Sequence, residues 1–450
     1  MTLARADNDA RDPATGQSMR ARNGPSSSAA TEPPASVAPS PAPSQSSLRG
    51  LDWFVFCVAD VQTGFGPFVA VYLTTQKWTQ VDIGLILSVA GIVALIGQMP
   101  GGALVDAARS ERFVAGLAIV AIAVSALTYA AFPIFPVVLA AATLHAAASC
   151  VLGPALAAIS LGLVGHAAIA ERFGRNARFA SVGNGLTAAL MGTFGHFFSP
   201  RIVFIITALL LVPALLALRK ISAGEIDAVR AHGGTRQKAA ETTRMHVHVP
   251  SILHKRPLLI FAGCVLLFHL ANAAMLPLMG SALTMRSSEW ATVLIAACIV
   301  VPQLVVAGIS PWVGRHAASW GRRPLLLIGF AALPIRAVLF ATVTDPHFIV
   351  LVQVLDGVTA AVFGVMVPLI IADLTRGTGR FNLAQGVVGT MTGIGAAAST
   401  SIGGYMTDHF GSQTAFLGLG GVAAVALTVA LIFMPETRPA QTQASPHGLA

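Results

Sequence analysis

The feature that most constrains this chain is a stretch of 58 residues, from Phe113 to Ala170, without a single Asp, Glu, Lys or Arg. A soluble domain rarely contains such a stretch, because about a quarter of its residues are charged. Over the whole chain only 10% of the residues are charged and 55% are hydrophobic. A membrane-spanning helix needs about 20 consecutive apolar residues. The sequence therefore predicts an integral membrane protein and argues against a soluble enzyme.

Hydrophobic blocks recur along the chain and predict an all-α membrane protein with twelve transmembrane helices. The blocks cover residues 52–74, 80–105, 113–132, 136–165, 177–198, 201–218, 257–280, 288–313, 324–343, 347–372, 382–407 and 412–434. We expect two six-helix bundles, residues 49–218 and 257–436, joined by a basic linker, 219–256. Residues 1–48, rich in Ala, Ser and Pro, are predicted to be a disordered cytoplasmic tail, and residues 437–450 a second cytoplasmic tail.

The basic residues predict the orientation of these helices. If the N-terminus is cytoplasmic, 24 of the 28 Lys and Arg residues fall in cytoplasmic segments, three in outer loops and one, Arg336, within a span. Cytoplasmic loops of membrane proteins carry such an excess of Lys and Arg. We therefore expect both termini in the cytoplasm of a bacterial-type inner membrane. The net charge of +9 then needs no nucleic-acid partner, although a basic nucleic-acid groove is the alternative explanation.

The two halves of the chain also resemble each other. The first span reads ADVQTGFGPFVAVYL and the seventh HLANAAMLPLMGSAL, which aligns Pro67 with Pro277. The fifth and eleventh spans open with ARFASVGNG and GRFNLAQGV, which aligns Arg178 with Arg380. Chance similarity between apolar segments is the alternative. Six plus six spans, a basic linker and repeated halves resemble the major facilitator superfamily of secondary transporters. That resemblance implies two pseudo-symmetric bundles around a central cavity.

A loop motif of that superfamily is present in degraded form. GGALVDAARSER, after the second span, keeps Gly102 and Asp106 of the pattern G-x-L-x-D-R-x-G-R-R and meets a basic position loosely with Arg112. Its counterpart in the second half keeps Arg322 and Arg323. The resemblance implies a gating loop that stabilises one orientation of the cavity. A helix N-terminus beside Asp106 would favour its charge. A solvated loop that only sets the topology is the alternative.

Ionisable and polar side chains inside the predicted spans are candidates for function, because they are costly at membrane depth. In the fold that the chain resembles, spans 1, 4, 7 and 10 line the cavity, and each carries such groups here. They are Asp60 and Gln62, His145, His269 and Asn272, and Gln353 and Asp356. We expect Asp60 and Asp356 to exchange protons, and Gln62, His145, His269, Asn272 and Gln353 to line the substrate cavity.

Arg336 and Asp356 are predicted to pair. Arg336 lies about eight residues from the outer end of its span and Asp356 about nine from the start of the next, so the two lie at similar depth at 1.5 Å per residue. This hairpin is similar to that of the superfamily's sugar and nucleoside proton symporters, which implies a coupling role for both residues. A purely structural pair is the alternative.

These observations predict a secondary active transporter that is not an enzyme. We expect proton coupling, alternating access and export of a small, partly apolar organic compound. The predicted partners are that substrate, protons and the lipid bilayer, with no nucleic acid, no cofactor and no metal, and the predicted oligomeric state is a monomer. The main alternative is a proton symporter that imports a sugar, nucleoside or organic acid. A non-transporting receptor and an intramembrane enzyme are further alternatives.

Overall fold

A computed structural model describes residues 42–63, 66–234, 255–286 and 291–438. Within these ranges all regular structure is helical. Most of the predicted N-terminal tail, much of the linker and most of the C-terminal tail lie outside the described residues.

The first half of the chain, residues 42–234, begins with α1, and several of its helices start at a side-chain cap. The hydroxyl of Thr79 accepts a hydrogen bond from the N–H of Asp82 at the start of α3, and that of Ser110 accepts one from Phe113 at the start of α4, which satisfies N–H groups that lack a partner within the helix. The helices are α1 (Gln45–Thr63), α2 (Gly66–Thr75), α3 (Gln80–Ala107), α4 (Glu111–Ala131), α5 (Phe135–Phe197), α6 (Arg201–Leu209), α7 (Leu211–Lys220), the 3₁₀ turn η1 (Ala223–Glu225) and α8 (Ala228–Ala231).

Six helices are described in the second half, residues 255–438. Asp345 caps α15 by accepting hydrogen bonds from the N–H groups of His347 and Phe348. The helices are α11 (Arg256–Asn272), α12 (Met275–Arg286), α13 (Ala291–Trp320), α14 (Arg322–Thr342), α15 (Pro346–Leu374) and α16 (Phe381–Phe433).

Two helices are each interrupted by one glycine. In α5 the backbone of Gly165 has φ 69° and ψ 176°, and in α16 that of Gly411 has φ 82° and ψ 160°. Positive φ values are strained for residues with a Cβ atom and open to glycine. Each helix therefore consists of two segments, 135–164 and 166–197 in α5, and 381–410 and 412–433 in α16.

The helices are apolar enough for a membrane. Among the described residues, nine helices are long and hydrophobic enough to cross a bilayer. Helix α3 exposes a series of large apolar side chains, including Val81, Ile92 and Ile96. Apolar patches of this extent on a helix surface mark contact with lipid or a partner rather than with water.

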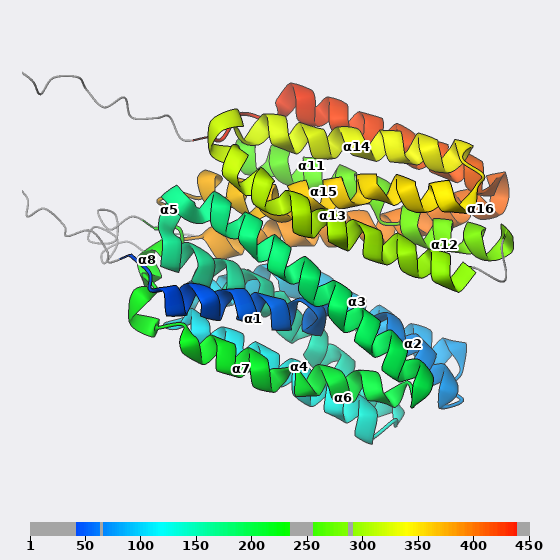
Figure 1. Cartoon of the computed structure of the whole chain (residues 1–450), viewed down its shortest axis with the longest axis horizontal. Helices are drawn as coiled ribbons and strands as arrows, with labels where there is room; N and C mark the ends of the chain where they lie inside the picture. Colours follow the sequence, from blue (N-terminus) through cyan, green and yellow to red (C-terminus); the bar gives the residue numbers. More distant parts are fainter. Residues whose placement is uncertain (1–41, 64–65, 235–254, 287–290, 439–450) are drawn as a thin grey trace, which may run out of the picture. The chain divides into compact units, whose positions relative to one another are not determined.

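Two hydrophobic cores hold the described chain together. One consists of residues between Leu51 and Ala231, and the other of residues between Leu258 and Met434 together with a few residues of α5 such as Phe173. In Figure 1 the helices α1 to α7 lie together and α11 to α16 lie together. Helix α5 packs on α13, and α3 packs on α16, so these four helices join the two halves.

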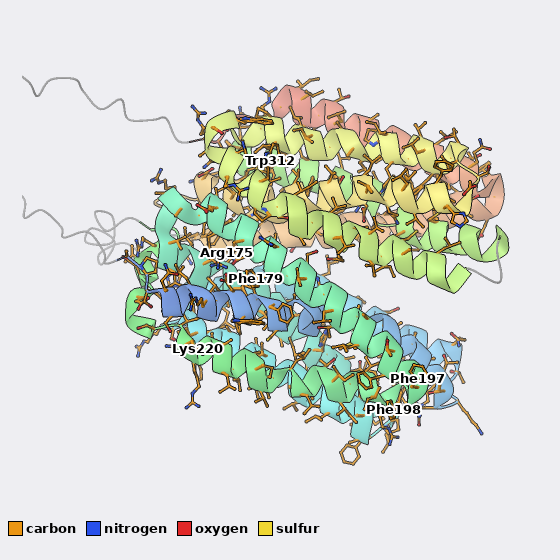
Figure 2. All side chains as sticks on the ribbon, viewed as in Figure 1. Arg175, Phe179, Phe197, Phe198, Lys220 and Trp312 are labelled. Atoms are coloured by element: carbon orange, nitrogen blue, oxygen red, sulfur yellow. The ribbon has the colours of Figure 1, made fainter. Side chains whose placement is uncertain are left out.

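We call the end of the helices that lies beside α8 the linker end. It includes the start of α4 and the start of α16, which α8 and the residues after it contact. It also includes the end of α3, where Asp106 contacts the start of α16. Figure 2 shows Arg175 and Lys220 toward this end and Phe197 and Phe198 toward the other end of the first half.

Candidate substrate cavity and linker-end closure

A cavity of about 430 Å³ lies between the two halves. Helices α1 and α5 of the first half and α13, α15 and α16 of the second half contribute to its wall. Its polar lining residues are Asn176, Ser181, Asn184, Gln303 and Gln385, and most of the others are small or apolar, among them Val55, Leu156, Ala177, Val306 and Gly364. Such a lining offers apolar contact and a few hydrogen-bonding groups that can orient a ligand.

A hydrogen bond crosses the cavity wall from one half to the other. The hydroxyl of Ser181 in α5 lies 2.5 Å from the side-chain oxygen of Gln303 in α13 and 2.8 Å from its backbone oxygen. The amide nitrogen of Gln303 is therefore turned away from this bond. This contact joins the halves beside the cavity.

A buried ion cluster adjoins the cavity in the first half. The carboxylate of Asp52 lies 2.6 Å from Arg172 and 2.5 Å from Arg175, and the side chains of Asp52 and Arg172 are both only 3% exposed. Arg172 also donates to the side-chain oxygen of Asn176 at 2.7 Å, and Asn176 donates to Ser160 at 2.8 Å. Because Asn176 lines the cavity, this network connects the cavity wall to the start of α1.

At the linker end, α3 of the first half meets the start of α16 in the second. The carboxylate of Asp106 accepts hydrogen bonds from the backbone N–H groups of Asn382 (3.2 Å) and Leu383 (2.8 Å) and from the side-chain amide of Asn382 (2.9 Å). These are N–H groups that have no partner within their own helix, and the helix dipole favours a negative charge there. Asp106 therefore caps a helix of the opposite half.

Close backbone approach accompanies this cap. A Cβ atom added to Gly102 would lie 2.8 Å from the carbonyl carbon of Asn382 and closer still to its oxygen. A second contact joins α5 and α13, where a Cβ atom on Gly174 would lie 2.6 Å from the oxygen of Ser310 and one on Gly314 would lie 2.5 Å from the oxygen of Ala170. Only glycine permits such approach, so the linker end is tightly closed.

The segment 223–234, which contains η1 and α8, contacts both halves. In the first half, the oxygen of Gly162 accepts hydrogen bonds from the N–H of Asp227 (3.2 Å) and from Arg230 (3.0 Å). In addition, Nε2 of His232 lies 3.1 Å from Oε1 of Glu111. In the second half, the carbonyl groups of His232 and Gly233 accept hydrogen bonds from the N–H groups of Phe381 (3.1 Å) and Gly377 (2.6 Å).

The structure brings three of the predicted site residues together inside the second half. The guanidinium group of Arg336 in α14 forms an ion pair with Asp356 in α15 and donates to the side-chain oxygen of Asn272 at the end of α11. It also contacts the sulfur of Met275 at 3.3 Å. Arg336 is 2% exposed and Asp356 is 26% exposed. None of these residues is among those that line the 430 Å³ cavity.

The other predicted cavity residues lie at separate places. His145 in α5 is half-buried, with Nε2 3.5 Å from the hydroxyl of Ser149. His269 in α11 packs edge-on against Phe268 and Phe363, and Gln353 in α15 is buried. Asp60 and Gln62 lie in α1, but their side chains are outside the described part of the structure.

The predicted gating arginines make contacts at the linker end within their own halves. Arg112 donates to the carbonyl of Leu218 at 3.2 Å. Arg322 forms an ion pair with Asp373 at 2.9 Å, and Arg323 donates to the carbonyl of Leu431. The contact between the halves at Asp106 is therefore made with amide groups, not with arginines.

Sequence reasoning missed the cluster around Asp52. It placed the fifth span at residues 177–198 and used Arg172 and Arg175 only to set the orientation. The second segment of α5 begins at residue 166 instead, so both arginines lie on a helix. The signal that could have revealed the cluster is Asp52, a carboxylate at the start of the first apolar block.

Comparison with known proteins agrees with the fold. The family model described as Major Facilitator Superfamily matches residues 53–335 and 273–449. An uncharacterized MFS-type transporter of Mycobacterium tuberculosis is 39% identical over 398 residues, 86% of this chain and 93% of the relative. The multi-drug resistance efflux pump PmrA of Streptococcus pneumoniae is 29% identical over 142 residues, 31% of this chain and 34% of the pump.

A solved structure shows the same fold. The fucose:proton symporter FucP of E. coli superposes with a TM-score of 0.62 at 14% identity and covers 86% of this chain and 97% of that chain. Members of the matched family are transporters, not enzymes, and are integral to the membrane, which accounts for the long apolar helices described above. Because the family model spans most of the sequence and a relative is 39% identical over 86% of it, the chain belongs to the major facilitator superfamily of membrane transporters.

Proposed function

We propose that the protein is a proton-coupled secondary transporter that exports a small, partly apolar organic compound by alternating access. In this proposal twelve spans form two six-helix bundles. The described helices support that count if α1 with α2, α6 with α7 and α11 with α12 each form one span and if α5 and α16 each form two. The two hydrophobic cores support the division into bundles.

The proposed orientation places the linker end in the cytoplasm of a bacterial-type inner membrane. Five arginines from five different segments support this location at one end through contacts with α7, α1, α5, α15 and α16: Arg112, Arg172, Arg230, Arg322 and Arg380. A cytoplasmic location fits the general excess of basic residues on that side of membranes. Both termini would then be cytoplasmic, and we propose that the protein acts as a monomer.

The observation that carries the transport proposal is the 430 Å³ cavity between the halves, next to a linker end that is closed. Alternating access requires a site shared by two repeats and a barrier that can form on either side of it. The contacts at Gly102, Asp106, Gly174 and Gly314 supply the barrier on the linker side. Five polar groups among small and apolar residues suit a compact substrate that is partly apolar.

For the proton step we propose Asp356 with Arg336, together with Asp60 in the first half. Asp356 is partly exposed while Arg336 is enclosed. Protonation of Asp356 would weaken its ion pair and leave the buried guanidinium to Asn272, its other oxygen partner. A change in the packing of α14, α15 and α11 would follow, because these helices carry the three residues.

Everted membrane vesicles loaded with an acridine pH dye would test this proposal. After an inside-acid gradient is formed, a transported compound from a panel of toxic organic compounds should release protons and restore the fluorescence. Asp356→Asn should abolish that release. Asp345→Asn removes an exposed carboxylate that caps α15 and lies 3.3 Å from the ring of His347, and this matched control should leave the release unchanged. Full proton release from Asp356→Asn would reject Asp356 as the coupling residue.

Import of a sugar, nucleoside or organic acid is the second candidate function. The Arg336–Asp356 pair supports it, and a protein with the same fold is named a fucose:proton symporter. The direction of flux separates the two functions. An exporter accumulates its compound in everted vesicles with an acidic interior, whereas an importer accumulates it in right-side-out vesicles with an alkaline interior.

A further inference from the structure

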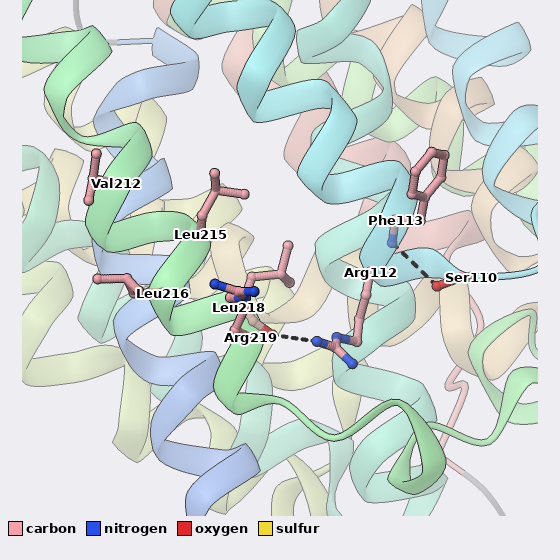
Figure 3. Close-up of a pocket in the computed structure, with 8 residues that line it drawn as sticks. All are labelled: Ser110, Arg112, Phe113, Val212, Leu215, Leu216, Leu218 and Arg219. Carbon is pink, nitrogen blue, oxygen red and sulfur yellow. Dashed lines mark hydrogen bonds between the residues drawn. The ribbon is translucent and has the colours of Figure 1, made fainter.

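A second hollow of the protein lies away from the cavity, between the start of α4 and the end of α7. This α4–α7 groove has a volume of about 550 Å³ and is drawn in Figure 3. One wall is apolar and open to the surroundings, with Phe113 71%, Val212 57% and Leu216 55% exposed. Arg112 and Arg219 stand at its linker end. A groove at the end of two apolar helices that combines these features can accept an amphipathic ligand.

One nitrogen of the Arg112 guanidinium group is hydrogen-bonded, and another has no acceptor among the described residues. One terminal N–H group donates to the carbonyl of Leu218 in the last turn of α7, where a cation is favoured by the helix dipole. Its Nε is buried and has no acceptor among the described residues, and a buried donor without a partner is destabilising. No described carboxylate forms an ion pair with Arg112 or Arg219.

The second half contains an arginine–carbonyl contact like that of Arg112, with a carboxylate beside it. There Arg323, at the start of α14, donates to the carbonyl of Leu431 near the end of α16, as Arg112 does to Leu218. The carboxylate of Glu436 lies at the start of α14 and accepts hydrogen bonds from the backbone N–H groups of Arg322 (2.9 Å) and Arg323 (3.1 Å). Nε of Arg323, like that of Arg112, is buried without an acceptor among the described residues. The second half thus carries a carboxylate beside its arginine, bound to the backbone at the helix start.

In the first half no described acidic side chain takes that place, since the carboxylate of Glu111, next to Arg112, lies 3.1 Å from His232 instead. The hydroxyl of Ser110 accepts the hydrogen bond from the N–H of Phe113 at 3.3 Å, and the chain after Leu218 continues with Arg219 and Lys220. Among the described residues, the repeat therefore has two arginine–carbonyl contacts but a carboxylate beside only one of them. The charge of the α4–α7 groove favours an anion that the described residues do not supply.

We propose that the α4–α7 groove binds an anionic phospholipid. The phosphate would accept hydrogen bonds from Arg112 and Arg219, because guanidinium groups match phosphate oxygens in charge and geometry. An acyl chain would cover Phe113, Val212 and Leu216, which a free phosphate ion would leave bare. Basic pockets between helices at a membrane surface bind lipid headgroups in this way. The proposal concerns lipid binding alone and does not depend on the transported compound.

Native mass spectrometry of the full-length protein in detergent would test the proposal. The protein would be titrated with dioleoyl phosphatidylglycerol, with zwitterionic dioleoyl phosphatidylcholine and with inorganic phosphate. We expect phosphatidylglycerol to bind more tightly than phosphatidylcholine. The double variant Arg112→Gln with Arg219→Gln should weaken phosphatidylglycerol binding about tenfold or more, the loss expected when charged hydrogen bonds are removed.

Two further variants keep the test decisive. Arg219→Gln changes an exposed side chain for which no intramolecular bond is seen, so it should fold normally and still weaken phosphatidylglycerol binding about threefold or more. Lys77→Gln with Arg201→Gln removes the same charge from exposed residues outside the groove and should leave binding unchanged. Equal weakening by this control, equal binding of phosphatidylcholine, or displacement of the lipid by inorganic phosphate would each overturn the proposal.

Discussion

Replacing Gly102 with alanine should open the linker end. The added methyl group would lie 2.8 Å from the carbonyl carbon of Asn382 and 3.1 Å from the Cα atom of Leu383. Ordinary carbon–carbon contact needs about 3.5 Å, so the backbones of α3 and α16 would have to separate by at least about 0.7 Å, and by more to clear the oxygen of Asn382. Both neighbours are backbone atoms of a helix start, and neither can rotate away as a flexible side chain could.

The size of the effect follows from this geometry. Extra methyl groups in a tightly packed contact cost about 1–3 kcal/mol. The cost applies only to the closed arrangement, because an open linker end separates α3 from α16. The ratio of closed to open molecules should therefore fall about 5- to 150-fold. The separation would also lengthen the hydrogen bonds from Asn382 and Leu383 to Asp106.

Electron–electron resonance between two spin labels would measure this shift. Arg109 and Arg376 are exposed on opposite halves near the closure, and the four native cysteines are buried. Gly91→Ala is the matched control, because Gly91 lies on the same helix and a Cβ atom there would meet nothing within 4 Å. We expect a longer distance population in Gly102→Ala only. An unchanged distance distribution in that variant would refute the closure argued from α3 and α16.

Three more predictions concern charged groups. Asp106→Ala should destabilise the closed linker end by about 1–3 kcal/mol, because three N–H groups lose a charged acceptor; the same spin-label pair would measure it, and an unaltered distance would contradict the cap. The double change Arg336→Ala with Asp356→Ala should lower the melting temperature less than Asp356→Ala alone, which leaves a buried guanidinium group without its carboxylate at a cost of about 3–5 kcal/mol; additive losses in a thermal-melting cycle would rule out the pair. Burial raises the pKa of the Glu436 carboxyl, but backbone N–H groups, first that of Arg322, lower it by more, so the pKa lies below its ordinary value of 4.5. Glu436 therefore stabilises the fold above that value and loses its effect as the pH falls further, and the stability gap between wild type and Glu436→Gln should shrink in melts between pH 7 and pH 3.5; a constant gap would contradict this.

The helices themselves were largely predictable from the sequence. Block 113–132 corresponds to α4, Glu111–Ala131, and block 324–343 to α14, Arg322–Thr342. Uncharged apolar runs favour helices in lipid, because a helix satisfies its own backbone groups. The helix rise of about 1.5 Å per residue also predicted that Arg336 and Asp356 lie at similar depth and pair. The third partner, Asn272, could not be placed, because its contact depends on how α11 packs against α14.

The lining of the cavity was less predictable. Asn176 lies just before the predicted start of a span and Ser181 lies just inside it. Asn176 pairs with Arg172, four residues earlier, and Ser181 pairs with Gln303, 122 residues later in the other half. A count of Lys and Arg in each loop predicts the orientation of the helices, but it cannot show whether an arginine has a partner. The partner of Asp106 was equally hidden, because an N–H group at a helix start carries no sequence signature that could identify the residue that caps it.

The segment 223–234, which contains α8, makes different kinds of contact with the two halves. Toward the first half it is held by the guanidinium group of Arg230 and a backbone amide, and His232 lies beside Glu111, while toward the second half it offers mainly carbonyl oxygens of the main chain. Hydrogen bonds from a charged donor such as Arg230 are stronger than those between neutral backbone groups. When the linker end opens, we expect this segment to travel with α5 and to release the start of α16.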